Sequence, residues 1–228
     1  MDAEKFFEAP GASLLIIPEG EVKRVIREEF FCRRDLTPEQ RTLLESARVL
    51  LIMLDNASGA FAQNQPSAAL QISRHADVIG ENAEGALHRF TSADCRRIGE
   101  LFEVLSLFRR IVCALKRMCE AAAAPLEGLD EARGFIGSLC RGMADELDWS
   151  AKRRLLGAQR GGLGMDDIEL SLSELPSSLA GENRPERIEA LLNFRDALLA
   201  AGELFGLLAE LSDLSERLFP AADDKYWR

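Results

Sequence analysis

Apolar residues recur every three or four positions along most of the chain, and this period predicts amphipathic α-helices rather than strands. The first helix should open at Thr37, which can cap it, with Pro38 in its first turn and Gln40 completing a capping box. Pro176 interrupts the fifth stretch. The six periodic stretches cover 43–61, 72–90, 98–124, 136–155, 168–179 and 186–218.

The turns between the first three stretches are only a few residues long, so these helices must be antiparallel neighbours. We predict an all-α fold of two consecutive antiparallel three-helix bundles, six main helices in all, over 37–125 and 126–220. An irregular arm with a short helix, 1–36, would precede them, and a tail, 221–228, would follow. The apolar run Leu14–Ile17 suits one strand but has no second strand to pair with. It is therefore expected to pack on a helix as extended chain.

The charge balance narrows the choice of partners. With 38 acidic and 28 basic residues among 228, the net charge is −10, which disfavours binding to a phosphate backbone. Nucleic acid is not expected as a partner. Basic residues still cluster locally. Such a cluster is either the solvated face of an amphipathic helix or a docking site, and a docking site would take an acidic partner or anionic lipid headgroups. The candidate docking residues are Arg96, Arg97, Arg109 and Arg110.

Residues suited to catalysis or metal binding form no recognisable constellation. His75 and His88 lie too far apart in sequence to share a ligand. The five cysteines form no Cys-x-x-Cys pair, and several sit among apolar residues, as small buried hydrophobes do in a reducing compartment. Acidic residues are abundant, but the Glu-x-x-His pattern of metal-carboxylate bundles is missing, as are nucleophile-elbow and phosphate-loop motifs. We predict a protein that is not an enzyme and uses no cofactor.

The expected location is the cytoplasm. The acidic start Met1–Glu8 differs from the basic start of a signal peptide. No stretch approaches the roughly 20 apolar residues that cross a bilayer. The alternative is that the chain is the cytoplasmic part of a longer membrane protein.

The stretch from Leu43 to Glu120 resembles a PhoU-type repeat, and the PhoU family builds a three-helix bundle twice in about this chain length. In the second helix, Asp77 and Ile79 stand in the place of the family's acidic-apolar pattern. The second half, 129–218, matches in helix count and apolar phase. The segments that resemble the three helices of the repeat are Leu43–Ala57, Ala69–Leu87, and Asp94–Ile98 leading into Leu107–Ile111.

One departure from the family concerns metal binding. PhoU proteins carry Glu-x-x-x-Asp on the third helix, where this chain has Arg109 and Cys113. We therefore expect no metal ligands at that motif. The resemblance implies regulation of phosphate transport or signalling, either through contact with a transporter or sensor kinase or as the cytoplasmic part of a sodium–phosphate cotransporter-like protein.

Our leading hypothesis is a non-enzymatic regulatory or adaptor protein that binds a partner protein, with a peripheral position at a membrane as one option. One alternative is a structural bundle that forms a homo-oligomer. Another is a bundle that binds a metal or small ligand between its helices.

Overall fold

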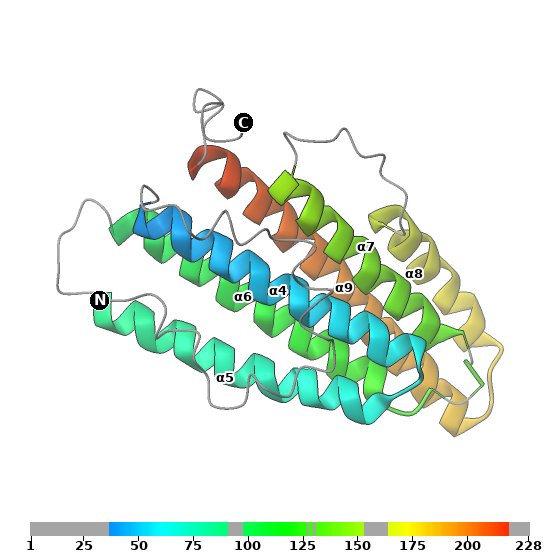
Figure 1. Cartoon of the computed structure of the whole chain (residues 1–228). Helices are drawn as coiled ribbons and strands as arrows, with labels where there is room; N and C mark the ends of the chain where they lie inside the picture. The colour runs from blue at the N-terminus through cyan, green and yellow to red at the C-terminus, as the bar shows by residue number, and fades with distance from the viewer. Residues whose placement is uncertain (1–36, 91–97, 127, 130, 153–163, 219–228) are drawn as a thin grey trace.

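Six α-helices make up the computed structural model, which describes residues 37–90, 98–126, 128–129, 131–152 and 164–218 (Figure 1). The predicted arm 1–36 and tail 221–228 lie outside the described residues. Within those residues no strand occurs, and the predicted all-α class is confirmed. The helices are α4 (Pro38–Ala62), α5 (Pro66–Phe90), α6 (Ile98–Ala123), α7 (Ala132–Lys152), α8 (Met165–Ala180) and α9 (Pro185–Leu218).

Helix ends follow the expected capping and breaking residues. The hydroxyl of Thr37 accepts a hydrogen bond from the Gln40 amide at 3.3 Å, and the Gln40 side chain accepts one from the Thr37 amide at 3.0 Å. This confirms the capping box. One expectation was wrong: Pro176 does not interrupt α8, which continues to Ala180. Proline lacks the N–H that would bond to the carbonyl four residues earlier, and its ring crowds that carbonyl. Pro176 is exposed, so water can bond to the freed carbonyl.

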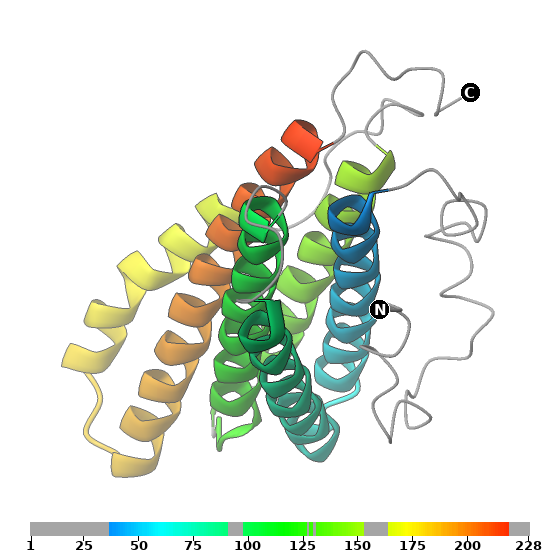
Figure 2. The same ribbon diagram turned by 90° about the vertical axis from the view of Figure 1, so that its left-hand side faces the viewer.

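The helices form two layers (Figure 2). Helices α8, α9, α6 and α5 lie side by side in that order, and α4 and α7 pack together against them. The helices of the first predicted bundle, α4 to α6, all contact one another, and α9 contacts both α7 and α8. Across the two sets, α4 packs on α7 and α6 packs on α9, and one hydrophobic cluster includes residues of all six helices. The two sets therefore lie side by side and share a core.

The contacts have an approximate two-fold pattern. If α4, α5 and α6 are matched in order with α7, α8 and α9, the α5–α6 contact corresponds to the α8–α9 contact. In the same way, the α4–α6 contact corresponds to the α7–α9 contact. Under this matching, the α4–α7 contact and the α6–α9 contact each correspond to themselves. The largest departure from the pattern is that α4 packs on α5 whereas α7 makes no comparable contact with α8. Helix α8 is thus held chiefly by α9.

The four central helices, α4, α6, α7 and α9, form a bundle in which α4 and α6 run one way and α7 and α9 the other (Figure 1). Such a bundle needs two long crossover connections. Here α5 and α8 lie within those connections, which explains why they are the outermost helices of their layer.

Helices α4 and α7 approach closely at a glycine. A Cβ atom added to Gly137 would lie 3.2 Å from Phe61 Cβ, 3.2 Å from the Ser58 carbonyl oxygen and 3.3 Å from the Ala62 amide nitrogen. Glycine at this position therefore lets the backbone of α7 rest on α4. A few residues farther along, an Arg141 to Asp55 ion pair of 2.9 Å joins the same two helices.

Arg133 ties together three parts of one end of the bundle. Its guanidinium donates to the carbonyls of Ala122 at 3.2 Å and Ala124 at 3.0 Å, which α6 leaves without helical partners. It also donates to Asn64 Oδ1 at 2.7 Å, in the turn between α4 and α5. A cation that bonds to the last carbonyls of a helix also interacts favourably with the helix dipole.

Replacing Arg133 with alanine is expected to lower the free energy of unfolding by roughly 1–3 kcal/mol, because two carbonyls and an amide oxygen lose their donor. Arg133→Lys should recover only part of the loss, since an ammonium cannot span three acceptors. Urea denaturation measures both changes. Arg141→Ala removes an exposed arginine from the same helix and should cost less than about 1 kcal/mol. Equal losses for the Arg133 and Arg141 variants would contradict the capping role.

Candidate interaction surface

A ladder of ion pairs crosses the outer face of the α8–α9–α6–α5 layer, which is the side turned away from α4 and α7. Its members recur every seven residues on α6 and on α9, the spacing that keeps side chains on one side of antiparallel packed helices. All six side chains are about half exposed, so solvent screens each pair and its contribution to stability is small. The pairs are Glu103 with Arg217, Arg110 with Glu210 at 2.8 Å, and Arg117 with Glu203 at 2.6 Å.

The basic docking cluster predicted from the sequence falls partly on this ladder. Arg96 and Arg97 lie outside the described residues. Arg109 and Arg110 are both exposed on α6. The Arg110 guanidinium donates to both carboxylate oxygens of Glu210, at 2.8 and 3.3 Å, so its charge is largely offset within the fold. Whether these arginines dock a partner stays a prediction.

Helix α5 is fixed to α6 by two polar contacts. Lys116 donates to Asp77 at 2.6 Å, and this hydrogen bond raises the pKa of the lysine. Ser73, which is buried, donates to Glu120 at 2.8 Å. Both edges of α6 are thus bound to neighbours, and the outer layer from α5 to α9 is one connected surface.

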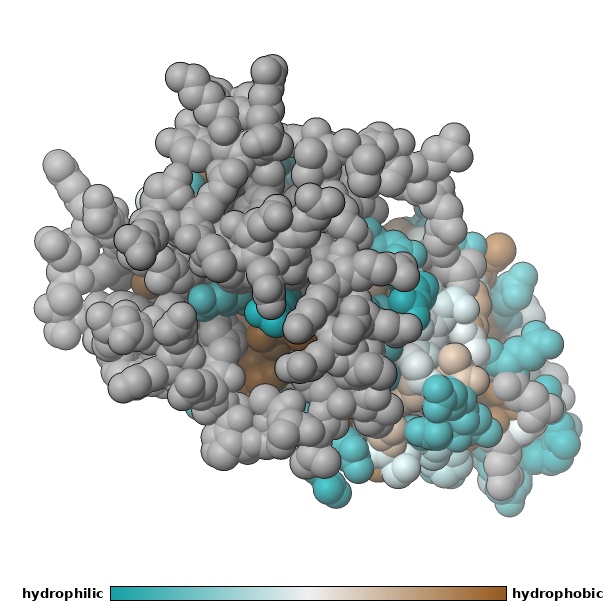
Figure 3. Space-filling model, viewed as in Figure 1, coloured by the Kyte–Doolittle hydropathy of each residue, from teal (hydrophilic) through white to brown (hydrophobic). Residues whose placement is uncertain are grey.

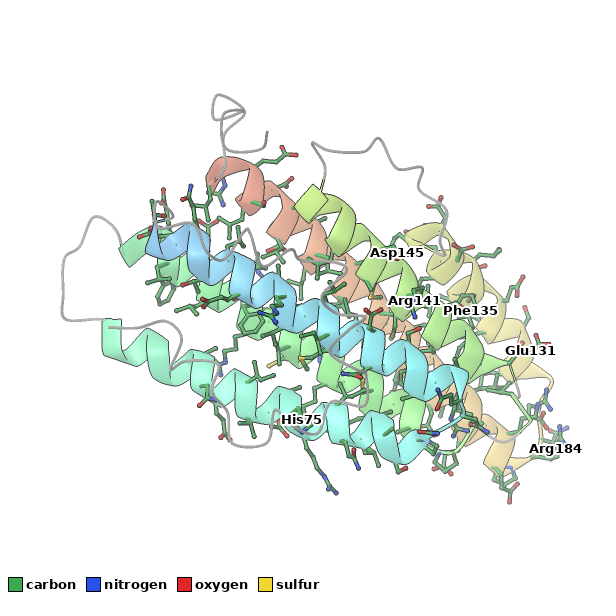
Figure 4. The ribbon with its side chains drawn as sticks, in the orientation of Figure 1. His75, Glu131, Phe135, Arg141, Asp145 and Arg184 are labelled. Atoms are coloured by element: carbon green, nitrogen blue, oxygen red, sulfur yellow. The ribbon has the colours of Figure 1, made fainter. Side chains whose placement is uncertain are left out.

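The residue types that usually carry chemistry are dispersed. Figure 4 places His75 on α5, well away from Asp145 on α7 and Arg184 in the turn before α9. No three potential metal ligands come together in the part of the chain that the structure describes. Acidic residues at the start of α6 and on α8 are exposed, except for the half-buried Asp167.

The described cysteines fall into two classes. Cys119 and Cys140 are buried in the core, and burial raises the pKa of the Cys119 thiol to about 12, with a smaller effect from Glu120. Burial also raises the pKa of Cys140. These two thiols stay protonated at neutral pH and pack as small hydrophobes, which matches the prediction. Cys113 is exposed on α6.

The α8–α9 patch, which consists of Met165, Leu192 and Leu199, is an apolar part of the outer face. Met165 and Leu199 are 45% and 53% exposed, and Leu192 is half-buried. The Met165 methyl group lies 3.7 Å from the position of a Cβ added to Gly202, so it rests over the stretch of α9 that carries Leu199. Leu192 and Leu199 are seven residues apart and share one side of α9.

Acidic residues accompany the patch. From Gly164 to Asn183 the chain has five acidic residues and no basic one. Asp167 accepts a hydrogen bond from the Gly164 amide at 2.7 Å and so closes the start of α8. Asp166, Glu169 and Glu174 are exposed and make no ion pair with other described residues. Figure 3 views the molecule from the α4 side, opposite to this outer face, and there hydrophilic and hydrophobic residues are interspersed on the right-hand side.

Glu182 organises the turn from α8 into α9. Its carboxylate accepts hydrogen bonds from the Arg184 guanidinium at 3.0 and 3.1 Å and from the backbone amides of Asn183 and Arg184. An ion pair of 3.0 Å also joins it to Arg187. The Arg184 guanidinium, and then the backbone amides, lower the pKa of Glu182 to about 2.

This lowered pKa predicts an acid-sensitive turn. A depressed carboxyl pKa stabilises the folded state above the unfolded pKa, and that contribution fades as the pH falls from about 4.5 to about 2. NMR titration of the Glu182 carboxyl carbon should give a midpoint near 2. In Glu182→Gln the stability should depend less on pH within this window. A midpoint near 4.5 would contradict the contacts.

Neither main feature of this surface was predicted from the sequence. The ladder has a signal in the sequence, because residues 103, 110 and 117 and residues 203, 210 and 217 are charged at heptad spacing. The pairing of acidic with basic residues could not be predicted without knowing how α6 and α9 are aligned. Leu199 follows Leu198 directly, and neighbouring positions on a helix point in different directions. Leu198 is buried and Leu199 is exposed.

No helix in the described ranges combines the length and apolar character that membrane crossing requires. The chain matches no protein-family model, and no curated protein or solved structure shows significant similarity to it.

Proposed function

We propose that this chain is a non-enzymatic regulatory or adaptor protein that binds a partner protein through the outer face of the α8–α9–α6–α5 layer. The observation that carries the proposal is the α8–α9 patch, where Met165 and Leu199 stay exposed beside a core that buries most other large apolar side chains. Adjacent exposed apolar residues with a polar rim are typical of protein-binding surfaces.

The ion pairs of the outer face support the same role. They tie α9 to α6 and α6 to α5, so the backbone of the face is already ordered before a partner arrives. A preordered surface pays a smaller entropic penalty on binding. An adaptor needs this property more than it needs reactive groups.

A narrower proposal is a PhoU-like regulator of phosphate transport or signalling. The approximate two-fold arrangement of two three-helix sets is in keeping with a family that builds such a bundle twice. On this proposal the partner is a transporter or a sensor kinase. Loss of this protein should therefore disturb phosphate transport or signalling.

The test is crosslinking of the tagged, full-length protein in cells of its source organism, followed by mass spectrometry. The expected result is one heterologous protein crosslinked reproducibly to residues of α8, α9 or α6. Crosslinks only between copies of this chain, together with a defined large oligomer in light scattering, would contradict the adaptor role and favour the oligomerising scaffold.

A further inference from the structure

Helix α8 is the least enclosed helix of the described fold. It packs on α9 through Ile168 and Leu175, which are buried, and makes no substantial contact with α7. One side of α8 lies beside a strip of α9 that no other described helix covers. That strip is bounded on its other side by the α6–α9 ladder.

The strip has an apolar floor. Leu199 lies three residues before Gly202, and Met165 rests over Gly202, so the two exposed side chains are neighbours across the α8–α9 seam. One turn farther along, no atom lies within 4 Å of a Cβ added to Gly206. A helix laid along the seam would meet little steric hindrance at this glycine.

The rim of the strip is acidic. Glu169 lies one turn after Met165 on α8, and Asp196 lies between Leu192 and Leu199 on α9; both are exposed. Glu203 borders the strip too, but Arg117 offsets its charge. Arg195 lies next to Asp196 and pairs with it at 2.8 Å, so the excess negative charge comes mainly from α8, whose span from Gly164 to Asn183 has no basic residue.

This charge selects among the possible occupants. A second copy docked through the same patch would place two acidic α8 helices together, which costs energy in a two-fold interface. An anionic lipid surface would be repelled for the same reason. A cationic helix with an apolar stripe matches both the floor and the rim, in the way that amphipathic helices bind apolar grooves of other proteins.

We propose that the α8–α9 patch binds a cationic amphipathic helix of the partner protein, an inference that rests on the adaptor function proposed above. Apolar residues of that helix lie on Met165 and Leu199, and its Lys or Arg side chains pair with Glu169 and with other exposed acids of α8. Charge complementarity speeds association and orients the helix, while the apolar contacts lengthen the life of the complex.

The test uses a fluorescein-labelled synthetic helix of about 18 Leu and Lys residues, long enough to form several turns with one apolar and one cationic face. Fluorescence anisotropy measures its affinity for the full-length protein. Leu199→Glu should weaken binding about tenfold or more. Leu70→Glu is the matched control, because Leu70 is a similarly exposed leucine on α5, and its effect should stay within about twofold.

A second pair of variants separates local charge from net charge. Glu169→Lys and Glu81→Lys change the total charge equally, but only the first alters the patch. We expect Glu169→Lys to weaken the peptide severalfold and Glu81→Lys to have little effect. All four variants should keep the parent's unfolding midpoint, since the four side chains are exposed.

Three results would overturn the docking site: no binding of the Leu/Lys peptide, equal losses for the patch and control variants, or preferential binding of anionic phosphatidylserine vesicles. Self-association that Leu199→Glu abolishes would also overturn it, in favour of a second copy. A crosslinked partner that Leu199→Glu still retains would leave the adaptor function standing and remove only this site.

Discussion

Replacing Phe108 with alanine is expected to lower the free energy of unfolding by about 3–5 kcal/mol, the usual cost of deleting a buried aromatic ring. Phe108 lies on α6, is completely buried and belongs to the core cluster that all six helices share. Because α6 contacts α4, α5 and α9, a cavity in its buried face would weaken its packing on its neighbours. Urea denaturation followed by circular dichroism measures the loss.

Phe102 is the matched control, since it is a phenylalanine on the same helix and is half exposed. Phe102→Ala should change the free energy of unfolding by less than about 1 kcal/mol, because little apolar surface is lost and alanine favours the helix. Similar losses at the two positions would mean that the α6 face assigned to the core is wrong.

Replacing Gly137 with leucine should also be strongly destabilising, by about 1–3 kcal/mol or more, as is typical when a packed core must admit extra atoms. Any side chain there meets Phe61 and the α4 backbone at 3.2 to 3.3 Å. Backbone atoms cannot rotate away as a flexible side chain can, so α7 must move off α4. Thermal unfolding should show the loss as a lower midpoint.

The control for Gly137 is three residues earlier in the same helix. A Cβ added to Gly134 meets no atom within 4 Å, so Gly134→Ala should raise the free energy of unfolding by about 0.5–1 kcal/mol through better helix propensity. Destabilisation by Gly134→Ala together with tolerance of Gly137→Leu would contradict the α4–α7 contact.

The elements of this fold were predictable from local patterns. The 3.6-residue period and the capping box at Thr37 depend on residues close in sequence, and α4 begins where Thr37 predicts. How the two sets pack on each other depends on side chains far apart in the chain. Gly137 illustrates the limit, because a helical glycine looks unfavourable until α4 is seen against it.

The candidate surface was predictable in part. The exposed positions of Arg109 and Arg110 follow from their place on the polar side of α6. The pairing of Arg110 with Glu210 joins residues one hundred positions apart and needs the antiparallel α6–α9 register. No prediction was made for Leu199, whose exposure depends on where α8 sits on α9.

The outer face is useful to an adaptor only if the two helix sets form one folded unit, because α6 belongs to the first set and α9 to the second. If the sets opened independently, the ladder would break and the α8–α9 patch would lose its fixed neighbour. The shared core and the α4–α7 and α6–α9 contacts predict that they do not open separately.

Native-state hydrogen exchange tests this directly by measuring the opening free energy of each backbone amide in low concentrations of denaturant. We predict that the slowest amides of α4 and α6 and those of α7 and α9 share one opening free energy, equal to that of global unfolding. Two separate plateaus, one for 37–125 and one for 126–218, would contradict the single core.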